Sequence, residues 1–415
     1  MEALKEAMLT VDEARRRLIG LVGVLPSSAT PLQQAHGLVL AGGVTARRDL
    51  PGFDNSAMDG FAVRAADTSG ASDARPARLL LTGEVAAGGV FPGDLRPGTA
   101  VRIMTGAPLP EGADAVIEVE RTKIDADTVL VLEEVQRERS VRRAGDDIRR
   151  GDEALGSGAW LGPAQLALLA ALGETDPLCH PRPRVAVIPT GDELVDPSRQ
   201  PGPGQVADVV SSALPAAVVE AGGAAQVIAR AHDTEKDVRR AFADARDADL
   251  VVTVGGVSMG EYDYVRRVIE SDGELDFWRV AMRPGKPLAV GKVGGRPVVG
   301  LPGNPVSALV GFELYVLPAI LAMSGRGGWS RPRRVCTLMS DISTPVGLRT
   351  FLRAVAVPGE GRLEVTPLPG QGSHQMRWMA AANALIDVAA DVADVHAGQE
   401  VDAILIDRPV GPSPW

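Results

Sequence analysis

Between Pro183 and Gly325 the sequence alternates short apolar runs with segments of helical periodicity. The apolar runs are nearly continuous and include RVAVIP, DLVVTV and RPVVG. Such strands are typical of a parallel sheet that is covered on both faces, because neither face then carries a polar stripe. The segments between them are long enough to form crossover helices. This stretch therefore predicts a doubly wound α/β domain.

The rest of the chain follows other patterns. At roughly 150 residues per domain, 415 residues predict about three domains. Short β-rich runs separated by Gly, Pro and Asp turns flank the α/β stretch. The predicted fold class is multidomain α/β plus β. In chain order we expect an N-terminal helix packing with the α/β domain (1–26), a linker domain (27–46 and 148–175), a β-rich domain (47–147), the α/β domain (176–327) and a C-terminal β domain (328–415).

Charge and cysteine content narrow the function classes. With 43 basic and 53 acidic residues the net charge is −10, which argues against broad nucleic-acid binding. Cys179 and Cys336 lack a CxxC partner, so neither a disulfide framework nor a structural zinc site is indicated. No segment approaches the roughly 20 uncharged apolar residues of a membrane span, and the first residues lack a signal-peptide pattern. We expect a soluble, cytoplasmic protein with no nucleic-acid and no membrane partner.

Three strand-to-helix loops of the α/β stretch carry glycines and polar residues. In an open α/β sheet, ligands bind beyond the carboxyl ends of the strands, where such loops gather. The candidate positions, loop by loop, are Thr190, Asp192 and Glu193; Gly255, Gly256, Ser258 and Asp263; and Pro302, Asn304 and Pro305. Neither GxGxxG nor GxxxxGK[ST] occurs, which argues against a dinucleotide oxidoreductase and against a P-loop NTPase.

The second of these loops indicates an anion site. Its glycines let backbone N–H groups approach a ligand, and a helix N-terminus favours a phosphate. The same loops carry four carboxylates, Asp192, Glu193, Glu261 and Asp263. Carboxylates repel a phosphate unless a divalent cation or a basic side chain intervenes, which predicts Mg²⁺. Alternatively, Asp263 only caps the following helix, and Asn304 with Pro305 forms a cap and first-turn pair; both interpretations are open.

A basic cluster follows in FWRVAMRPGKP, which contains Arg279, Arg283 and Lys286. A Pro-Gly turn would bring Arg283 and Lys286 together. Such charges would hold an oxyanion such as molybdate or sulfate. The alternative is a solvated turn that is merely basic.

In the β-rich domain, polar loops contain Asp59, Thr105 and Asp147. Local composition alone favours turn residues over ligands at these positions. His232 precedes Asp233, but the sequence has no nucleophile elbow and no HExxH motif. A triad hydrolase or a zinc protease is therefore disfavoured, and His232 is predicted to be a surface or packing residue.

Read together, these loops resemble a known family. The strings FDNSAMDGFAV, RIMTGAPLPEGADAV, RRAGDDIRRG, PTGDEL, TVGGVSMGEYDYV, RPGKPLAVGK, GLPGNPVSALVGFE and QGSH occur in this order. Their content and order are similar to those of MoeA proteins and of the gephyrin E domain. The resemblance covers about residues 10 to 405, and its most diagnostic strings are DNSAMDG, GGVSMGEYD and LPGNPVS.

The resemblance implies an architecture and an activity. The subunit would be an elongated four-domain protein with a MogA-like α/β domain. Two subunits would form a homodimer, with the active-site cleft between the α/β domain of one and the β domains of the other. The enzyme would be a molybdopterin molybdenumtransferase that binds adenylated molybdopterin and molybdate, uses Mg²⁺, cleaves the pyrophosphate bond, and releases molybdenum cofactor and AMP. A MogA-type adenylyltransferase is the protein partner that it suggests.

The resemblance also assigns roles to individual residues. The catalytic residues would be Asp59, Asp147, Glu193 and Asp263, of which Glu193 and Asp263 would serve Mg²⁺ or pterin binding. Lys286 would bind phosphate or molybdate. The further substrate-binding positions expected are Thr105, Thr190, Asp192, Asp208, Asp233, Gly255, Gly256, Ser258, Arg279, Arg283, Pro302, Asn304, Pro305 and Ser373.

Two departures from the family pattern leave alternatives open. Arg279 and Arg283 stand where relatives often carry Lys. At both positions a planar guanidinium with several N–H donors therefore replaces a compact ammonium group. The loop from Ala207 to Val210 keeps Asp208 but replaces the polar residues that are usual beside it. A diverged paralogue that acts as a molybdopterin-binding scaffold, or that inserts another oxyanion such as tungstate, is the alternative. A nucleotide hydrolase unrelated to molybdenum would instead release AMP without molybdate.

Overall fold

The structure is a computed structural model that describes residues 8–257, 263–328 and 330–406. The chain forms two compact units, each of which is described by itself. The first unit comprises Met1–Ser28, Gly37–Val39 and Cys179–Trp415, and the second comprises Ala29–His36 and Leu40–Leu178. The finer domain boundaries expected from the sequence stay predictions.

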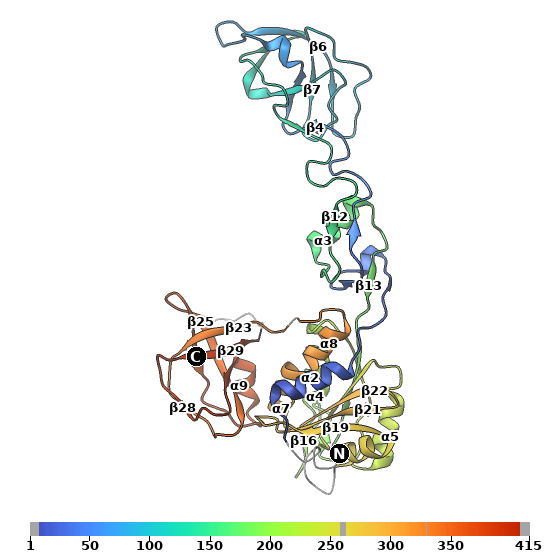
Figure 1. The fold of residues 1–415 in the computed structure, drawn as a ribbon, viewed down its shortest axis with the longest axis vertical. Helices are drawn as coiled ribbons and strands as arrows, with labels where there is room; N and C mark the ends of the chain where they lie inside the picture. Colours follow the sequence, from blue (N-terminus) through green and yellow to red (C-terminus); the bar gives the residue numbers. More distant parts are fainter. Residues whose placement is uncertain (1–7, 258–262, 329, 407–415) are drawn as a thin grey trace. The chain divides into compact units, whose positions relative to one another are not determined.

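A six-stranded sheet forms the centre of the α/β part of the first unit (Figure 1). Its strands, in spatial order, are β17 (Ala224–Val227), β14 (Arg184–Pro189), β18 (Leu250–Val254), β22 (Arg296–Leu301), β21 (Pro287–Val293) and β19 (Gly273–Arg279). The first four strands run parallel, while β21 and β19 run antiparallel to their neighbours. Gly294 and Gly295, both with positive φ, make the two-residue hairpin turn from β21 to β22. The predicted doubly wound α/β fold is confirmed, with an antiparallel edge added to it.

Helices cover both faces of this sheet, as Figure 1 shows. One face packs against α2 (Val11–Leu21), α4 (Val210–Glu220), α7 (Pro305–Gly311) and α8 (Leu317–Met323). The other face packs against α5 (Glu235–Asp244) and α6 (Tyr264–Asp272). The N-terminal helix belongs to the larger core through Val11, Ala14 and Leu18. Burial on both faces explains why the strands are nearly continuous apolar runs.

One helical segment is unusually long and apolar. Pro305–Met323, which includes a π-helical turn at Phe312–Val316, is 19 residues long with a mean hydropathy of 1.9. By length and composition it is the one described helix able to cross a membrane, although it contains Glu313. In the structure, 83% of the apolar window is buried inside the protein, as in a core helix.

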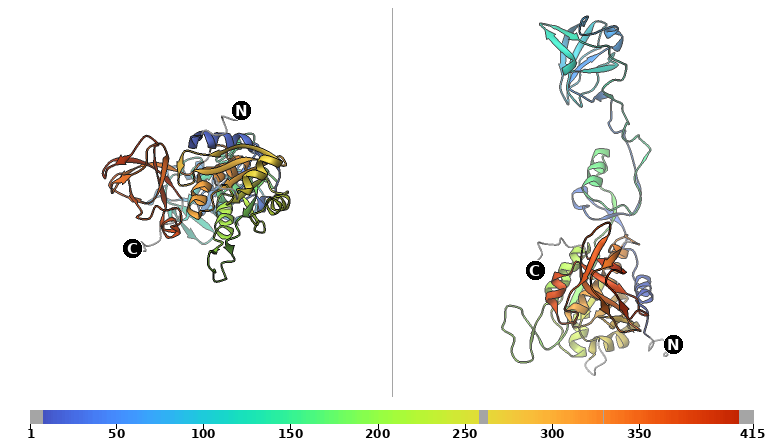
Figure 2. Two further views of the ribbon diagram at one scale, coloured as in Figure 1. Left: turned by 90° about the horizontal axis from the view of Figure 1, so that it is seen from below. Right: turned by 90° about the vertical axis from the view of Figure 1, so that its left-hand side faces the viewer.

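The C-terminal part of the first unit is a closed β-barrel, which lies beside the α/β domain in the left view of Figure 2. Its strands are β25 (Arg349–Pro358), β26 (Leu363–Pro367), β23 (Arg333–Leu338), β29 (Glu400–Leu405) and β27 (Ala384–Val388). The pairing of β25 with β27 closes the ring. The short strand β20 (Met282–Arg283), from the α/β part, pairs in parallel with Arg349 and Thr350 of β25. Helix α9 (Met376–Ala381) precedes β27.

The second unit is mostly β structure. Its main sheet contains, in order, β8 (Ala115–Glu118), β5 (Gly60–Val63), β7 (Thr99–Ile103), β6 (Ala77–Val85), β10 (Thr128–Val131) and β9 (Thr122–Asp125). Smaller ladders join β4 (Asn55–Ser56) to β11 (Val141–Arg142) and β3 (Val44–Thr45) to β12 (Glu153–Leu155). Helix α3 (Pro163–Leu172) follows Gly162 and ends at Gly173, which has the left-handed conformation.

Candidate functional site

A cavity of about 900 Å³ lies at the carboxyl ends of β14, β18 and β22 in the first unit. The α/β part contributes the residues after these strands and the turn between β20 and β21, and the barrel part contributes a loop before α9. The lining residues that carry polar side chains are Thr190, Glu193, Asp233, Asp263, Arg283, Lys286, Asn304, Ser307, Gln371, Ser373 and His374. The cavity therefore brings together all three loops predicted from the sequence with the basic turn.

The loop after β14 packs tightly against the loop after β18. The buried Thr190 hydroxyl donates to the Val254 carbonyl at 2.9 Å, so it already has a partner. Gly255 has a φ of +97°, and a Cβ there would lie 2.5 Å from Thr190 Oγ1 and 2.7 Å from its carbonyl oxygen. Gly255 is therefore required for close packing of the two loops. This requirement does not depend on whether its backbone N–H also contacts a ligand. Glu193, in contrast, is exposed and lines the cavity.

Asp263 is the most unusual group of the site. Its side chain is buried, and neither carboxylate oxygen has a hydrogen-bond partner among the described residues. Burial raises the pKa of Asp263 to about 7, and the nearby charge of Arg266 opposes this rise. The residue occupies the N-cap position of α6, but its side chain makes no capping hydrogen bond that meets the usual geometry. The backbone N–H of Arg266 is near enough to lower the pKa of Asp263 slightly, yet burial outweighs it.

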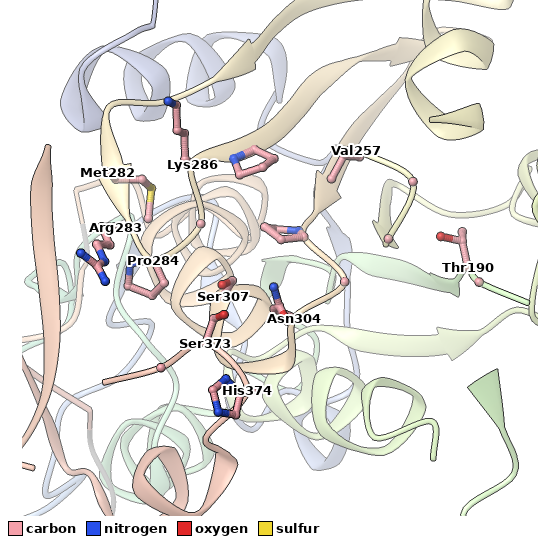
Figure 3. A pocket seen from close by; sticks show the side chains of 18 of the residues that line it. Thr190, Val257, Met282, Arg283, Pro284, Lys286, Asn304, Ser307, Ser373 and His374 are labelled. Carbon is pink, nitrogen blue, oxygen red and sulfur yellow. The ribbon is translucent and has the colours of Figure 1, made fainter. Parts of the chain in front are cut away.

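The basic cluster divides in the structure. Arg283 and Lys286 are exposed and line the cavity, and neither forms an ion pair with another described residue. Arg283 is the last residue of β20, and Lys286 lies in the turn that follows this strand (Figure 3). Arg279 instead stacks over the Trp278 ring, with its guanidinium carbon 3.9 Å from the ring centre, and is not a lining residue. Two of the three predicted cations therefore face the cavity.

Neutral polar side chains also line the cavity. Pro305 occupies the first turn of α7, and Asn304 is its N-cap residue but makes no side-chain capping bond. Figure 3 shows Asn304, Ser307 and Ser373 close together around the cavity. The backbone N–H of Val306 donates to the Ser373 carbonyl at 3.3 Å, which joins the barrel loop to α7. The sequence allowed Asn304 and Pro305 to be a helix cap and a first-turn residue. Pro305 has that role, but the Asn304 side chain makes no capping bond.

A buried arginine holds the barrel loop in place. Arg353 is fully buried and donates to the carbonyl oxygens of Gly370, at 2.6 and 3.2 Å, and of Gly372, at 3.2 Å. The Gln371 amide accepts from the Arg353 backbone N–H and donates to the Arg353 carbonyl, at 3.0 and 2.9 Å. Sequence reasoning singled out Ser373 in this loop, but not its neighbours Gln371 and His374, although the string QGSH contains all three.

Other predicted positions lie outside the cavity lining. Asp192 is exposed and pairs with His232 Nδ1 at 2.6 Å, and this hydrogen bond holds the pKa of Asp192 below its usual range. Asp208 accepts from the backbone N–H groups of Val210 and Ser211, both at 3.0 Å, and so caps the start of α4. Ser258 lies outside the described residues.

Asp233, Gly256 and Pro302, which the sequence singled out as candidates, line the cavity.

In the second unit, the polar loops meet one another. Asp59 Oδ1 accepts from the backbone N–H and the hydroxyl of Thr105, both at 2.7 Å, and these bonds hold the pKa of Asp59 below its usual range. Arg143 forms an ion pair with Asp54, and β4 pairs with β11 beside it. Asp147 is exposed, and its backbone N–H donates to the Leu50 carbonyl at 3.0 Å. Three loops that are distant in sequence therefore form one polar surface of this unit.

Comparison with protein-family models covers most of the chain. Residues 9–173 match the MoeA N-terminal region (domain I and II). Residues 186–322 match a probable molybdopterin binding domain, and residues 336–406 match the MoeA C-terminal region (domain IV).

Individual relatives match over nearly their whole length. Molybdopterin molybdenumtransferase 2 of Mycobacterium tuberculosis (strain ATCC 25618 / H37Rv) is 42% identical over 404 residues, covering 95% of this chain and 98% of the relative. Molybdopterin molybdenumtransferase of Haemophilus influenzae is 36% identical over 406 residues, with the same coverage of 95% and 98%. The crystal structure of a molybdopterin biosynthesis MoeA protein from Pyrococcus horikosii superposes with a TM-score of 0.82 at 32% identity, covering 97% of this chain and 100% of that one.

Proposed function

The chain belongs to the MoeA family and is a molybdopterin molybdenumtransferase of molybdenum cofactor biosynthesis; from that premise we propose that it inserts molybdate into adenylated molybdopterin, with Mg²⁺, and releases AMP. The cavity supports a substrate of this size, because about 900 Å³ lies at the upper end of the range for ligand sites, roughly 300–1,000 Å³. A pterin joined to a nucleotide by a pyrophosphate is a ligand of that class.

One observation carries the proposal: Asp263, whose carboxylate has no hydrogen-bond partner among the described residues, lines the same cavity as the cations Arg283 and Lys286. A purely anionic ligand would be attracted by the two cations but repelled by ionised Asp263. A purely cationic ligand would have the opposite difficulty. A pyrophosphate that carries a divalent cation satisfies both kinds of group, since the metal binds the carboxylate and the phosphate oxygens bind the basic side chains.

The donor set fits Mg²⁺. Within the ranges that the structure describes, no three His, Cys, Asp or Glu side chains are grouped as a metal cage. Mg²⁺ does not require such a cage, because it is commonly held by one or two carboxylates together with phosphate oxygens and water. Asp263 and Glu193 would hold the ion from the protein side. When bound, Mg²⁺ supplies charge neutralisation for the pyrophosphate and for the departing phosphate of AMP.

The chain's own residues provide binding and positioning. Arg283 and Lys286 bind the oxyanion through charge-assisted hydrogen bonds, and Ser307 and Ser373 supply neutral hydroxyl donors. An oxygen of molybdate attacks the phosphorus on the pterin side of the pyrophosphate, the bond from that phosphorus to the bridging oxygen breaks, and the bridging oxygen leaves with AMP. No protein nucleophile is needed for this step, so the rate depends on orientation and on charge compensation.

The altered loop from Ala207 to Val210 does not favour the scaffold alternative. None of its residues lines the cavity, and the Asp208 carboxylate is occupied in capping α4. The change of polar residues there removes no group from the described cavity. Asp263 and Lys286 are kept and Arg283 retains a positive charge, which favours catalysis. The preference between molybdate and tungstate depends on how the planar Arg283 guanidinium fits each anion.

We further propose that the enzyme acts in the cytoplasm as a homodimer, and that it receives its adenylated substrate from a MogA-type adenylyltransferase. In this proposal the Asp59–Thr105 cluster takes part in catalysis. The ionised state of Asp59, which both Thr105 hydrogen bonds favour, supports such a role.

Replacing Asp263 or Asp59 by Asn tests the proposal in a reconstituted assay with adenylated molybdopterin, Mg²⁺ and molybdate. Each substitution keeps the shape of the side chain but removes its charge, so molybdate-dependent AMP release should fall at least about 100-fold. Asp272→Asn is the matched control, because Asp272 is paired with Arg239 and does not line the cavity. Full activity in both the Asp263 and the Asp59 variants would contradict the proposal.

A further inference from the structure

The strand that carries Arg283 is held on one edge by Arg349. The Arg349 backbone N–H donates to the Ala281 carbonyl at 3.0 Å, and Met282 and Arg283 pair in parallel with Arg349 and Thr350. This pairing is only two residues long. A ladder of this length has few hydrogen bonds of its own. The position of β20 therefore depends on the contacts that hold Arg349 in β25.

The Arg349 side chain is fixed by a chain of alternating charges. Its Nε and Nη2 donate to the two oxygens of Asp387, both at 2.7 Å, in a bidentate pair. Arg333 Nη1 reaches the same carboxylate at 2.7 Å, and Arg349 Nη1 binds Asp12 Oδ2 of α2 at 2.8 Å. Asp387 is buried, and its carboxylate is fully used by the two arginines. The network thus links three barrel strands to the N-terminal helix.

The same N-terminal segment holds the other edge of the cationic turn. The Leu9 backbone N–H donates to the Arg279 carbonyl at 3.2 Å, and the Ala281 N–H donates to the Leu9 carbonyl at 2.8 Å. Leu9 lies three residues before Asp12. The segment that leads to Arg283 is therefore clamped between Leu9 on one side and Arg349 on the other, and Asp12 connects the two sides of the clamp.

We propose that the Asp12–Arg349–Asp387–Arg333 network is a positioning device for the oxyanion site, which fixes the height and direction of Arg283 at the cavity. This inference rests on the proposed function for the identity of the oxyanion, but not for the mechanical role of the network. Asp387 and Arg349 do not line the cavity and are therefore positioning residues, not catalytic ones. Their effect on the anion is transmitted through β20.

The geometry makes Asp387 the decisive member. Asp12 is half exposed, so water replaces its contact with Arg349 at little cost, whereas the buried Asp387 compensates two arginines at once. Asp387→Asn keeps the side-chain volume, removes the charge and turns an –NH₂ toward a guanidinium. Arg349 then loses its bidentate partner, and with it the constraint on the strand beside β20.

The first test measures backbone opening directly, in the full chain without ligands. Hydrogen–deuterium exchange of peptides covering 280–287 should be at least about fivefold faster in Asp387→Asn than in wild type. Glu313→Gln is the matched control, because Glu313 is also a buried carboxylate in a bidentate pair, with Arg331 at 2.8 and 3.2 Å, and neither residue lines the cavity. The control should leave exchange at 280–287 unchanged. Equal exchange in Asp387→Asn and wild type would overturn the proposal.

The second test separates positioning from general damage. With adenylated molybdopterin and Mg²⁺ held saturating, Asp387→Asn should raise the KM for molybdate about tenfold and leave kcat within about twofold, while Glu313→Gln should change neither. Arg333→Gln, which removes one exposed arm of the network, is the milder variant should Asp387→Asn fail to fold, and it should shift both readouts in the same direction. A fall in kcat at constant KM would overturn the proposal.

If wild type releases no AMP, the proposed function fails, and the exchange experiment still decides whether the network positions β20.

Discussion

At the scale of single residues, Asp263 connects the fold to the chemistry most directly. A buried carboxylate whose oxygens have no hydrogen-bond partner among the described residues is costly when ionised. The cost appears as the rise of its pKa to about 7. Near neutral pH the protonated and the ionised forms of Asp263 are therefore both populated, and the proposed Mg²⁺ would favour the ionised form.

This pKa predicts how stability depends on pH in the metal-free protein. The folded pKa lies above the ordinary value of 3.8, so the native state holds an extra proton between about pH 4 and pH 7. The resulting stabilisation is complete at low pH and is lost as pH rises through 7. We therefore expect the free energy of unfolding of Asp263→Asn in urea to exceed that of wild type, and we expect this excess to grow by on the order of 3 kcal/mol between pH 5 and pH 8.5. A gap that does not grow with pH would show that Asp263 titrates normally.

The sequence predicted Asp263, Arg283 and Lys286 as candidates because charged residues on strand-to-helix loops and in a tight turn are visible locally. It did not distinguish a cap from a ligand, because that depends on where the carboxylate points after folding. Ser307 and Gln371 were missed for a related reason: one lies inside an apolar helix, and the other belongs to a different domain. Their place at the cavity follows from packing between distant segments.

At the scale of elements, the parallel strands and their covering helices could be predicted, because strands that are buried on both faces have nearly continuous apolar sequences. The antiparallel edge was less accessible, although the Gly294–Gly295 hairpin is a recognisable signal. Closure of the barrel was not predictable, because the pairing of β25 with β27 joins strands that are about 35 residues apart. Local patterning specifies a strand but not its partner.

The loop that carries Ser373 illustrates an element held by one buried group. Arg353→Met should leave the Gly370 and Gly372 carbonyls without their donor, which should lower the free energy of unfolding by about 2–4 kcal/mol. Proteolytic cleavage within 370–375 should also become faster. Arg362→Met serves as the control, because that side chain pairs with Glu400 at the surface and should change stability by less than about 0.5 kcal/mol. Equal stability of the two variants would show that Arg353 does not hold the loop.

At the scale of the whole molecule, the motifs that identify the family occur in both compact units. The cavity with Asp263, Arg283 and Lys286 belongs to the first unit, and the Asp59–Thr105 cluster belongs to the second. Neither composition nor periodicity predicted an important role for Asp59, which looked like a turn residue. The structure gives it a specific arrangement, since both hydrogen bonds from Thr105 keep it ionised.

The central claim is that the cavity couples molybdate to cleavage of the pyrophosphate. The most direct test incubates purified wild-type protein with adenylated molybdopterin and Mg²⁺, with and without molybdate, and measures AMP together with active molybdenum cofactor. We expect AMP and cofactor to appear in equal amounts, and only when molybdate is present. AMP release at the same rate without molybdate, and without cofactor, would contradict the account and would identify a nucleotide hydrolase instead.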